Sequence, residues 1–277
     1  MPPRNQHGVD LRWTRIAAAG LSLCGMLGTG CFREPPSPTA PRRVAVAAAA
    51  DLRFAMDELI GEFRQQHADI ELAVTYGSSG NLHAQLLSRA PFDIYFAADR
   101  GYPRQLVEKG LADSDSELLY AVGHIVVWVP RDSTIDVERL GMEAVVHPAA
   151  RKVAMANPQH APYGRAAEDA LKSSGLYERV RERLVLGDNI AQTAQFVESG
   201  AADVGILSLS LATAPALRDK GRFWLVPGDA YPPLEQSSVI MNWVGDRAAA
   251  EAFRAFVTGH RGRQVLRRYG FQLPHEG

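Results

Sequence analysis

Two adjacent serines, Ser78 and Ser79, lie between glycines in the segment VTYGSSGNLHAQLL (74–87). Serines in this setting can act as nucleophiles, cap the following helix, or donate hydroxyl groups to a bound anion. The nucleophile elbow has the spacing Gly-x-Ser-x-Gly, whereas this segment has Gly-Ser-Ser-Gly. A serine nucleophile also needs a histidine base, and the eight histidines form no motif, so each is interpreted as a surface or capping residue. The spacing therefore disfavours a nucleophile and leaves the cap and the anion site open.

The sequence contains no metal-ligating pattern. No two histidines are paired at helical spacing, both cysteines lie in the first 31 residues, and there is no calcium-loop series of carboxylates. Asp93 and Asp99 flank a strand that is too apolar to form a metal site, and they are interpreted as turn and cap residues. Because the glycine motifs of nucleotide-binding loops are also missing, we expect neither a metal centre nor a cofactor.

An anion site would depend on the elements around the serines. From Val44 onward, short apolar runs alternate with amphipathic segments, which is typical of α/β folds. A predicted strand gives way to a predicted helix within AAAADLRFAM (47–56), TYGSSGNLHAQ (75–85), ANPQHAPYGRAAEDAL (156–171) and LGDNIAQTAQF (186–196). The first amides of each helix have no acceptor inside the helix, and ligands of open α/β sheets collect at such ends. If the four junctions converge, they form an anion site without a lysine.

The predicted elements cover most of the chain after Val44. Helical spacing of apolar residues predicts helices over 54–67, 164–174, 191–199 and 248–257. Apolar runs predict strands over 44–49, 70–76, 92–98, 124–130, 152–157, 183–187, 203–208, 223–227 and 237–244. A chain of 277 residues is long enough for two lobes. Its net charge of −1 gives no reason to expect nucleic acid or an anionic membrane surface as a partner, so aimed donors must capture any anion.

Residues 1–31 have the layout of a secretory signal. Arg4, Arg12 and Arg15 precede the apolar stretch IAAAGLSLCGMLGTGC (16–31), which is too short and too interrupted for a good membrane span. The alternative, a buried N-terminal helix, is disfavoured by the proline-rich segment 32–43, which is interpreted as an extended tether.

Cys31 stands where a bacterial lipoprotein signal is cleaved and acylated, after Gly28, Thr29 and Gly30. The usual signal has leucine three positions before the cysteine, whereas Leu27 is four before it. We predict an exported, periplasmic protein anchored through lipidated Cys31, with ordinary cleavage and a freely soluble protein as the alternative.

Five segments, in order, resemble the molybdate-binding proteins of ABC transporters. They are AAAADLRFAMDEL (47–59), YGSSGNLHAQ (76–85), APFDIYFAADRGYPRQLVEKGLAD (90–113), NPQHAPYGRAAEDALKSSGL (157–176) and FVTGHRGRQVLRRYGF (256–271). GSSG alone is a weak signal, but the ordered series is specific and extends over nearly the whole mature chain.

This resemblance implies a two-lobed α/β fold of the type II periplasmic binding proteins, in which each lobe is a sheet flanked by helices. Lobe I would comprise 44–123 plus 233–277 and lobe II 124–232, with interlobe crossings near YAVGHIVV (120–127) and YPPLEQSS (231–238). The implied protein is a monomer, not an enzyme, that binds one tetrahedral oxyanion and delivers it to ABC permease subunits in the membrane.

In the resembled family, serine hydroxyls and backbone amides at helix starts hold the oxyanion. Matched by motif, Ser79 is the serine that donates, with Ser78 beside it. Tyr163 in APYG and Ile190 in DNIA would each contribute a backbone amide. Molybdenum would be present only within the bound molybdate.

Two positions depart from the family's pattern. Where the family has Ala-Ser-Leu, this chain has Ala50-Asp51-Leu52, and an ionised carboxylate facing a dianion in a desolvated pocket is strongly unfavourable. Either Asp51 caps its helix while Ala50 offers an amide, which we favour, or the ligand differs from the family's usual one. In GILSLS (205–210), Ser208 replaces a tyrosine and can donate only with a shorter side chain or through water.

The prediction is therefore high-affinity binding of molybdate, and also tungstate. A protein for another oxyanion or a small organic anion is the alternative, motivated by Asp51 and Ser208. An exported serine hydrolase that uses Ser78 or Ser79 is the alternative from a different class. Neutral donors would reject protonated oxyanions, whereas an Asp51 that faced the ligand would accept a proton from one.

Overall fold

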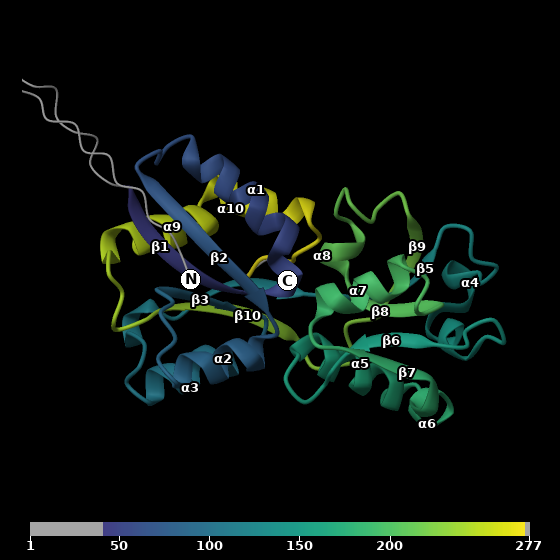
Figure 1. Ribbon diagram of the computed structural model, residues 1–277. Helices are drawn as coiled ribbons and strands as arrows, with labels where there is room; N and C mark the ends of the chain where they lie inside the picture. Colours follow the sequence, from purple (N-terminus) through teal and green to yellow (C-terminus); the bar gives the residue numbers. More distant parts are fainter. Residues whose placement is uncertain (1–40, 275–277) are drawn as a thin grey trace, which may run out of the picture. The chain divides into compact units, whose positions relative to one another are not determined.

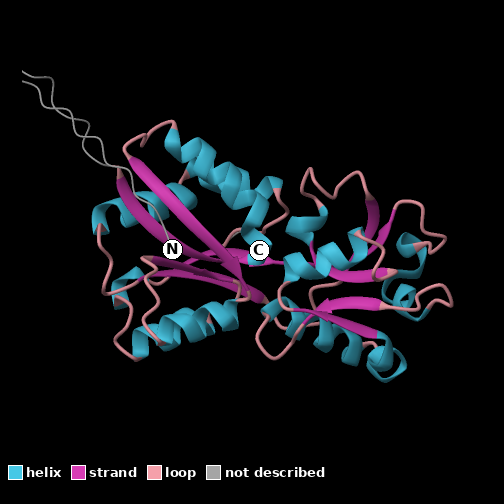
Figure 2. Cartoon of the chain, viewed as in Figure 1, coloured by secondary structure: helices cyan, strands magenta, loops and turns pink. Residues whose placement is uncertain are grey.

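The computed structural model describes residues 41–274, which form two five-stranded sheets flanked by helices (Figures 1 and 2). The predicted signal, most of the tether and Cys31 lie outside the described residues. No helix within 41–274 is both long enough and apolar enough to cross a membrane. The two sheets confirm the predicted α/β class.

The first sheet has the strand order β2-β1-β3-β10-β4. Its strands are β1 (Arg42–Ala49), β2 (Ile70–Gly77), β3 (Ile94–Ala97), β4 (Leu118–Gly123) and β10 (Leu234–Ile240). β1 pairs in parallel with β2 and β3, whereas β10 is antiparallel to both β3 and β4. The parallel strands β1 and β2 therefore end at the same edge, where the first two predicted junctions lie.

Alternation of side chains along β1 places helices on both faces of this sheet. Val44, Val46 and Ala48 pack in one cluster with α1 (Arg53–Arg64), α9 (Arg247–Thr258) and α10 (His260–Arg268). Ala47 points to the other face and packs with α2 (Ser79–Leu87) and α3 (Gly101–Glu108). Small alanines in β1 let the helices approach the sheet closely.

The second sheet has the strand order β7-β6-β8-β5-β9. Its strands are β5 (Ile125–Pro130), β6 (Val153–Ala156), β7 (Leu184–Gly187), β8 (Val204–Ser208) and β9 (Gly221–Leu225). The helices associated with this sheet are α4 (Val137–Leu140), α5 (Pro162–Ser173), α6 (Tyr177–Val180), α7 (Ile190–Glu198) and α8 (Leu209–Ala212). β6 is parallel to β7 and β8, so α5 and α7 begin at a common edge.

The chain changes sheets twice. Gly123 ends β4 and Ile125 begins β5, and the chain returns between β9 and β10. The two crossings are joined by a hydrogen bond of 3.2 Å from the amide of Ile125 to the hydroxyl of Tyr231. We call the groups built on the first and second sheets lobe I and lobe II; the residue boundaries predicted for them stay a prediction.

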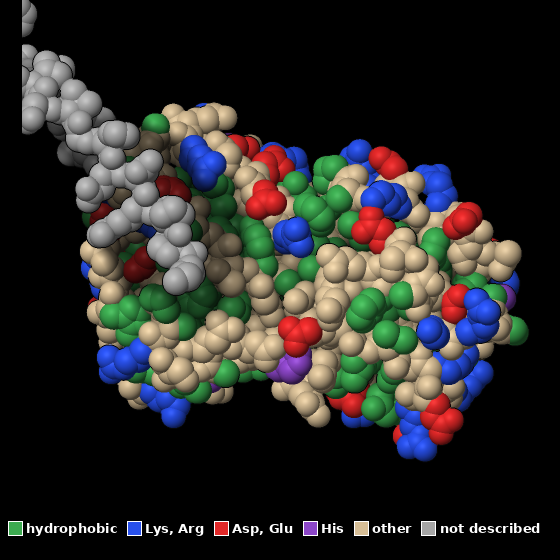
Figure 3. All heavy atoms as spheres, in the orientation of Figure 1, with side chains coloured by type: hydrophobic (Ala, Val, Ile, Leu, Met, Phe, Trp, Pro, Cys, Tyr) green, Lys and Arg blue, Asp and Glu red, His purple; other side chains and the backbone are tan. Residues whose placement is uncertain are grey.

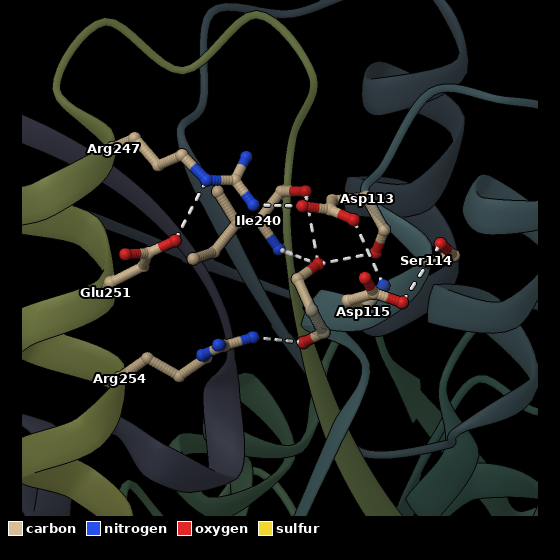
Figure 4. A network of polar contacts seen from close by, with 8 residues as sticks. Asp113, Ser114, Asp115, Ile240, Arg247, Glu251 and Arg254 are labelled. Carbon is tan, nitrogen blue, oxygen red and sulfur yellow. Dashed lines mark hydrogen bonds and ion pairs between the residues drawn. The ribbon is translucent and has the colours of Figure 1, made fainter.

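Short 3₁₀ helices connect several elements: η1 (Ala50–Leu52), η2 (Ser114–Ser116), η3 (Gly141–Val146) and η4 (Arg181–Arg183). Figure 4 shows how η2 is fastened to α9 in lobe I. Arg247 pairs with Asp113 and Glu251, and Arg254 donates to the backbone of Ser116. The buried hydroxyl of Ser116 accepts from the amide of Ile240 at 2.9 Å, which ties η2 to β10.

Candidate anion-binding site

The four strand-to-helix junctions meet around one small cavity. Its lining residues are Ala49, Ala50, Asp51, Gly77, Ser78, Ser79, Ala98, Ala161, Pro162, Tyr163 and Ile190. All but one of the predicted site residues are in this set; Ser208 is not. Residues up to Ala98 belong to lobe I and the others to lobe II, so the cavity lies between the lobes.

Ser79 presents a hydroxyl group that is free to donate. Its Oγ accepts a hydrogen bond of 3.0 Å from the amide of Ala98, and its carbonyl accepts from the hydroxyl of Tyr95 at 2.7 Å. Ser79 is 1% exposed, and its hydroxyl donates no hydrogen bond within residues 41–274. The first bond orients the side chain and the second holds the backbone, so the hydroxyl hydrogen remains available to an anion.

Ser78 is engaged differently from its neighbour. It is the N-cap of α2, and its Oγ accepts from the amide of Asn81 at 3.4 Å. The Nδ1 atom of His160, from lobe II, lies 3.0 Å from the same oxygen. His160, interpreted from the sequence as a surface or capping residue, is half-buried and contacts Ser78 across the two lobes. Its position opposite Ser78 arises from the packing of the lobes, because 82 positions separate the two residues in the chain.

Two helix starts in lobe II supply unpaired amides. α5 begins at Pro162 after Ala161, which makes no side-chain cap, so the amide of Tyr163 has no intrahelical acceptor. α7 begins at Ile190, and the side chain of Asn189 accepts from the amides of Ala191 and Gln192. That capping leaves the amide of Ile190 for another acceptor. Helix starts favour anions, because their free amides and the helix dipole both present positive charge.

Asp51 does not cap its helix, contrary to the favoured prediction. No side chain caps η1. Instead, Oδ2 of Asp51 accepts from the hydroxyl of Tyr163 at 2.9 Å and from Nε2 of Gln236 at 2.8 Å. Both donors bind the same oxygen, Oδ2, and both come from elements distant in the sequence, so no local pattern predicts them.

The Asp51 network is neutral apart from the carboxyl group itself. Burial raises the pKa of Asp51 to about 6, although the hydrogen bonds from Gln236 and Tyr163, and the nearby backbone amides of Asp51 and Leu52, oppose this shift. Burial, together with the charge on Asp51, also raises the pKa of Tyr163 and of Tyr120 well above the ordinary value. Tyr120 belongs to the same network, because its hydroxyl donates to Oε1 of Gln236 at 2.8 Å. Both phenols therefore stay protonated donors.

Ser208 lies behind the cavity wall. It is fully buried as the N-cap of α8, where its Oγ accepts from the amide of Leu211 at 3.3 Å and lies 3.0 Å from the hydroxyl of Ser210. The hydroxyl of Ser210 also lies 2.8 Å from the carbonyl oxygen of Asp51. The side chain of Ser208 is shorter than the tyrosine of the resembled family. It therefore supports α8 and reaches η1 only through Ser210.

The two lobes touch directly beside the cavity. The amide of Gly80 donates to the carbonyl of His160 at 2.8 Å, and Nδ2 of Asn81 donates to Asp188 at 3.2 Å. A Cβ atom on Gly80 would lie 2.6 Å from the His160 carbonyl oxygen, so only glycine permits this approach. The second glycine of GSSG thus serves the contact between the lobes.

No basic field surrounds the cavity. Its lining contains no lysine, arginine or histidine. In a neighbouring cleft, Arg165 donates to Asp99 at 2.5 Å and Arg100 to Glu235 at 2.8 Å, so these guanidinium groups are neutralised. Figure 3 shows positive and negative side chains interspersed on one face of the molecule. An anion in the cavity would be held by neutral donors.

The two sheets are joined by two crossings, and the first residues of several helices line a cavity between the lobes. This arrangement defines a solute-binding protein of the periplasmic type. Residues 44–272 match the family of bacterial extracellular solute-binding proteins, and the chain belongs to this family.

Individual relatives narrow the comparison and confirm the resemblance to molybdate-binding periplasmic proteins. The chain is 34% identical over 231 residues to the molybdate-binding protein ModA of Azotobacter vinelandii, covering 83% of this chain and 90% of that protein. It is 32% identical over 234 residues to ModA of Rhodobacter capsulatus, covering 84% and 90%. The solved structure of the Azotobacter vinelandii periplasmic molybdate-binding protein has a TM-score of 0.79 at 29% identity, covering 84% of this chain and all 100% of that chain.

Proposed function

We propose that this protein binds molybdate, and tungstate with it, in the cavity between the lobes. The observation that carries the proposal is the convergence of the uncommitted Ser79 hydroxyl with the free amides at Tyr163 and Ile190. Hydrogen bonds to a charged group contribute roughly 1.5–3 kcal/mol each, and a micromolar affinity corresponds to about 8 kcal/mol. A handful of such donors therefore suffices without a cation, and the protein needs no cofactor.

Selectivity would come from the size of the cavity. Molybdate, tungstate and sulfate carry the same charge, so neutral donors cannot separate them by electrostatics. The lining consists of backbone and small side chains at most positions, with Ala49, Ala50 and Ala98 among them. Such walls set a fixed radius, and we expect the larger oxyanions to reach all donors at once.

Calorimetric titration with molybdate, tungstate, sulfate and phosphate tests this function. Tight binding only for the first two supports it, whereas the absence of binding heat with molybdate overturns it.

Ser79→Ala should weaken molybdate binding by about tenfold or more, because it removes a hydrogen bond to a charged group. The matched control is Ser199→Ala, at an exposed serine that ends α7. Tight binding of phosphate or of a small organic anion instead would favour the alternative ligand class.

We further propose that the loaded protein is exported, acts as a monomer and delivers its ligand to ABC permease subunits. The family membership and the ModA relatives support this role. Cys31→Ser tests the predicted lipid anchor: the variant should leave the membrane fraction if Cys31 is acylated and behave like wild type if it is not.

The arrangement of Ser78, His160 and Asp188 is the observation that favours a hydrolase. Nε2 of His160 lies 3.6 Å from Asp188, which is beyond a hydrogen bond, and Ser78 is already used as a helix cap. Members of the family bind solutes, and we propose that this chain is likewise not an enzyme. Ester turnover abolished by Ser78→Ala or Ser79→Ala would reverse that conclusion.

A further inference from the structure

Asp51, which lines the cavity, carries a buried carboxylate oxygen without a partner among residues 41–274. The residue is 1% exposed and lines the cavity together with Ser78 and Ser79. Its Oδ2 atom accepts two hydrogen bonds, from Tyr163 and Gln236, whereas Oδ1 has no partner within residues 41–274. Buried polar atoms almost always have a partner, so an orphaned oxygen beside a cavity needs an explanation. A ligand atom in the cavity would provide one.

Among the residues that the structure describes, the surroundings of Asp51 contain no cation that could balance two negative charges. Its side-chain partners are the neutral groups of Tyr163 on α5 and Gln236 on β10, and Tyr120 on β4 lies behind Gln236. Of the helices packed against η1, α8 has no charged residue. On α1 and α7, Arg53 and Glu198 line a separate surface cleft. The remaining charged residues of α1 are Asp57, Glu58, Glu62 and Arg64, and none of them is among the main causes of the pKa shift of Asp51.

A dianion beside an ionised Asp51 would therefore meet an uncompensated negative charge in a desolvated site, where repulsion is strongest. Resting on the proposed function, we propose that the protein binds one proton together with each oxyanion, and that this proton lies between Oδ1 of Asp51 and a ligand oxygen. The proton comes from solvent and no covalent bond to the ligand forms. It converts Oδ1 from an orphaned, repelling atom into a partner of the anion, equivalent to one more hydroxyl donor.

The raised pKa of Asp51 makes proton uptake easier than at an ordinary carboxylate. Because the pKa of Asp51 is about 6, the carboxyl is mostly ionised at pH 8 and about half protonated at pH 6. A bound dianion raises that pKa further. Proton uptake on binding should therefore rise from about half a proton at pH 6 towards one proton at pH 8, and affinity should fall by about tenfold per pH unit in the upper part of this range.

Calorimetry with sodium molybdate tests the proposal on the whole mature chain. Titrations at pH 8 in buffers of different ionisation enthalpy measure proton uptake directly, and a series from pH 6 to 8.5 gives the slope of affinity. Wild type should take up close to one proton at pH 8, and Asp51→Asn should take up none and lose the slope. Asp69→Asn, at an exposed carboxylate, is the matched control and should behave like wild type.

The outcomes separate this inference from the proposed function. Tight molybdate binding without proton uptake, or an Asp51→Asn variant that keeps the wild-type slope, overturns the proton proposal and leaves molybdate binding intact. Absence of molybdate binding at every pH overturns the proposed function, and the proton proposal falls with it. If Asp51→Asn fails to fold by circular dichroism, Asp51→Ser gives the same comparison with a side chain that the resembled family uses.

Discussion

Tyr163 of lobe II donates a hydrogen bond of 2.9 Å to Asp51 of lobe I, and both side chains are almost fully buried. Gln236 closes the triangle, since its Nε2 atom lies 2.8 Å from Oδ2 of Asp51 and 2.9 Å from the hydroxyl of Tyr163. One of the contacts between the lobes therefore passes through an acidic side chain in the cavity wall. Protonation of Asp51 and contact between the lobes are coupled by this geometry.

Tyr163→Phe should raise the pKa of Asp51. The tyrosine hydroxyl stabilises the ionised carboxylate, and a hydrogen bond to a charged group is worth roughly 1.5–3 kcal/mol, or about 1–2 pKa units. The pKa should therefore move upward from about 6. Carboxyl carbon chemical shifts of the ligand-free protein, followed against pH, measure this directly. Tyr177→Phe, on the surface helix α6, should leave the value in place, and an unmoved pKa in Tyr163→Phe would show that the hydroxyl does not act on Asp51.

Asp51→Asn should stabilise the fold at neutral pH relative to wild type. The pKa of Asp51 is raised from 3.8 to about 6 in the folded state, so between these values the folded chain binds the extra proton. The free energy of unfolding of wild type therefore falls by roughly 3 kcal/mol as pH rises from about 4 to 6. Above pH 6 the contribution of Asp51 to this free energy is constant. Urea unfolding of both proteins at pH 4 and pH 7.5 checks this. The advantage of the variant should grow with pH, and an equal difference at both values would contradict it.

The sequence was informative where the signal was local. The GSSG segment predicted a helix cap or an anion site, and the resemblance chose Ser79 as the donor; the structure places the cap at Ser78 and a free hydroxyl at Ser79. The strand-to-helix junctions at APYG and DNIA are confirmed as the starts of α5 and α7. The predicted helices over 54–67, 164–174, 191–199 and 248–257 are confirmed as α1, α5, α7 and α9, with small shifts at their ends. These elements depend on turn chemistry and amphipathic spacing, which a short window contains.

What the sequence did not reveal depends on contacts between distant residues. Gln236 lies in β10 and reaches Asp51 across 185 positions, and no local pattern marks it as a donor to a carboxylate. Asp51 was expected to cap its helix because the nearest amides were the only partners visible in the sequence. β4 was missed as a strand because it lies at the sheet edge, where it pairs only with β10, and its residues were assigned to the crossing.

Ser116→Ala should destabilise lobe I without touching the cavity. The hydroxyl of Ser116 accepts from the amide of Ile240 at 2.9 Å and donates to the carbonyl of Asp113 at 2.7 Å, at 1% exposure. Removing it leaves a buried amide without its partner, a loss of about 1–3 kcal/mol. Ser114→Ala, at the exposed start of the same 3₁₀ helix, is the control and should cost little. Chemical denaturation compares the two, and equal stabilities would contradict the role of Ser116.

Gly80→Ala should weaken ligand binding while leaving lobe I intact. Alanine suits the first turn of α2 better than glycine, so the helix itself gains stability. The new Cβ would lie 2.6 Å from the carbonyl oxygen and 2.9 Å from the Cα of His160, which are backbone atoms and cannot rotate away. The lobes must separate locally and lose the bond from the Gly80 amide. Overpacking of about 1–3 kcal/mol and a lost hydrogen bond of about 0.5–1.5 kcal/mol predict molybdate affinity lower by roughly tenfold to a thousandfold.

Gly61→Ala is the control, because Gly61 is an exposed glycine of α1 with nothing within 4 Å of its Cβ position. Calorimetry on both variants should show the loss only for Gly80→Ala, and wild-type affinity in that variant would mean that the lobes do not need this contact to hold the ligand.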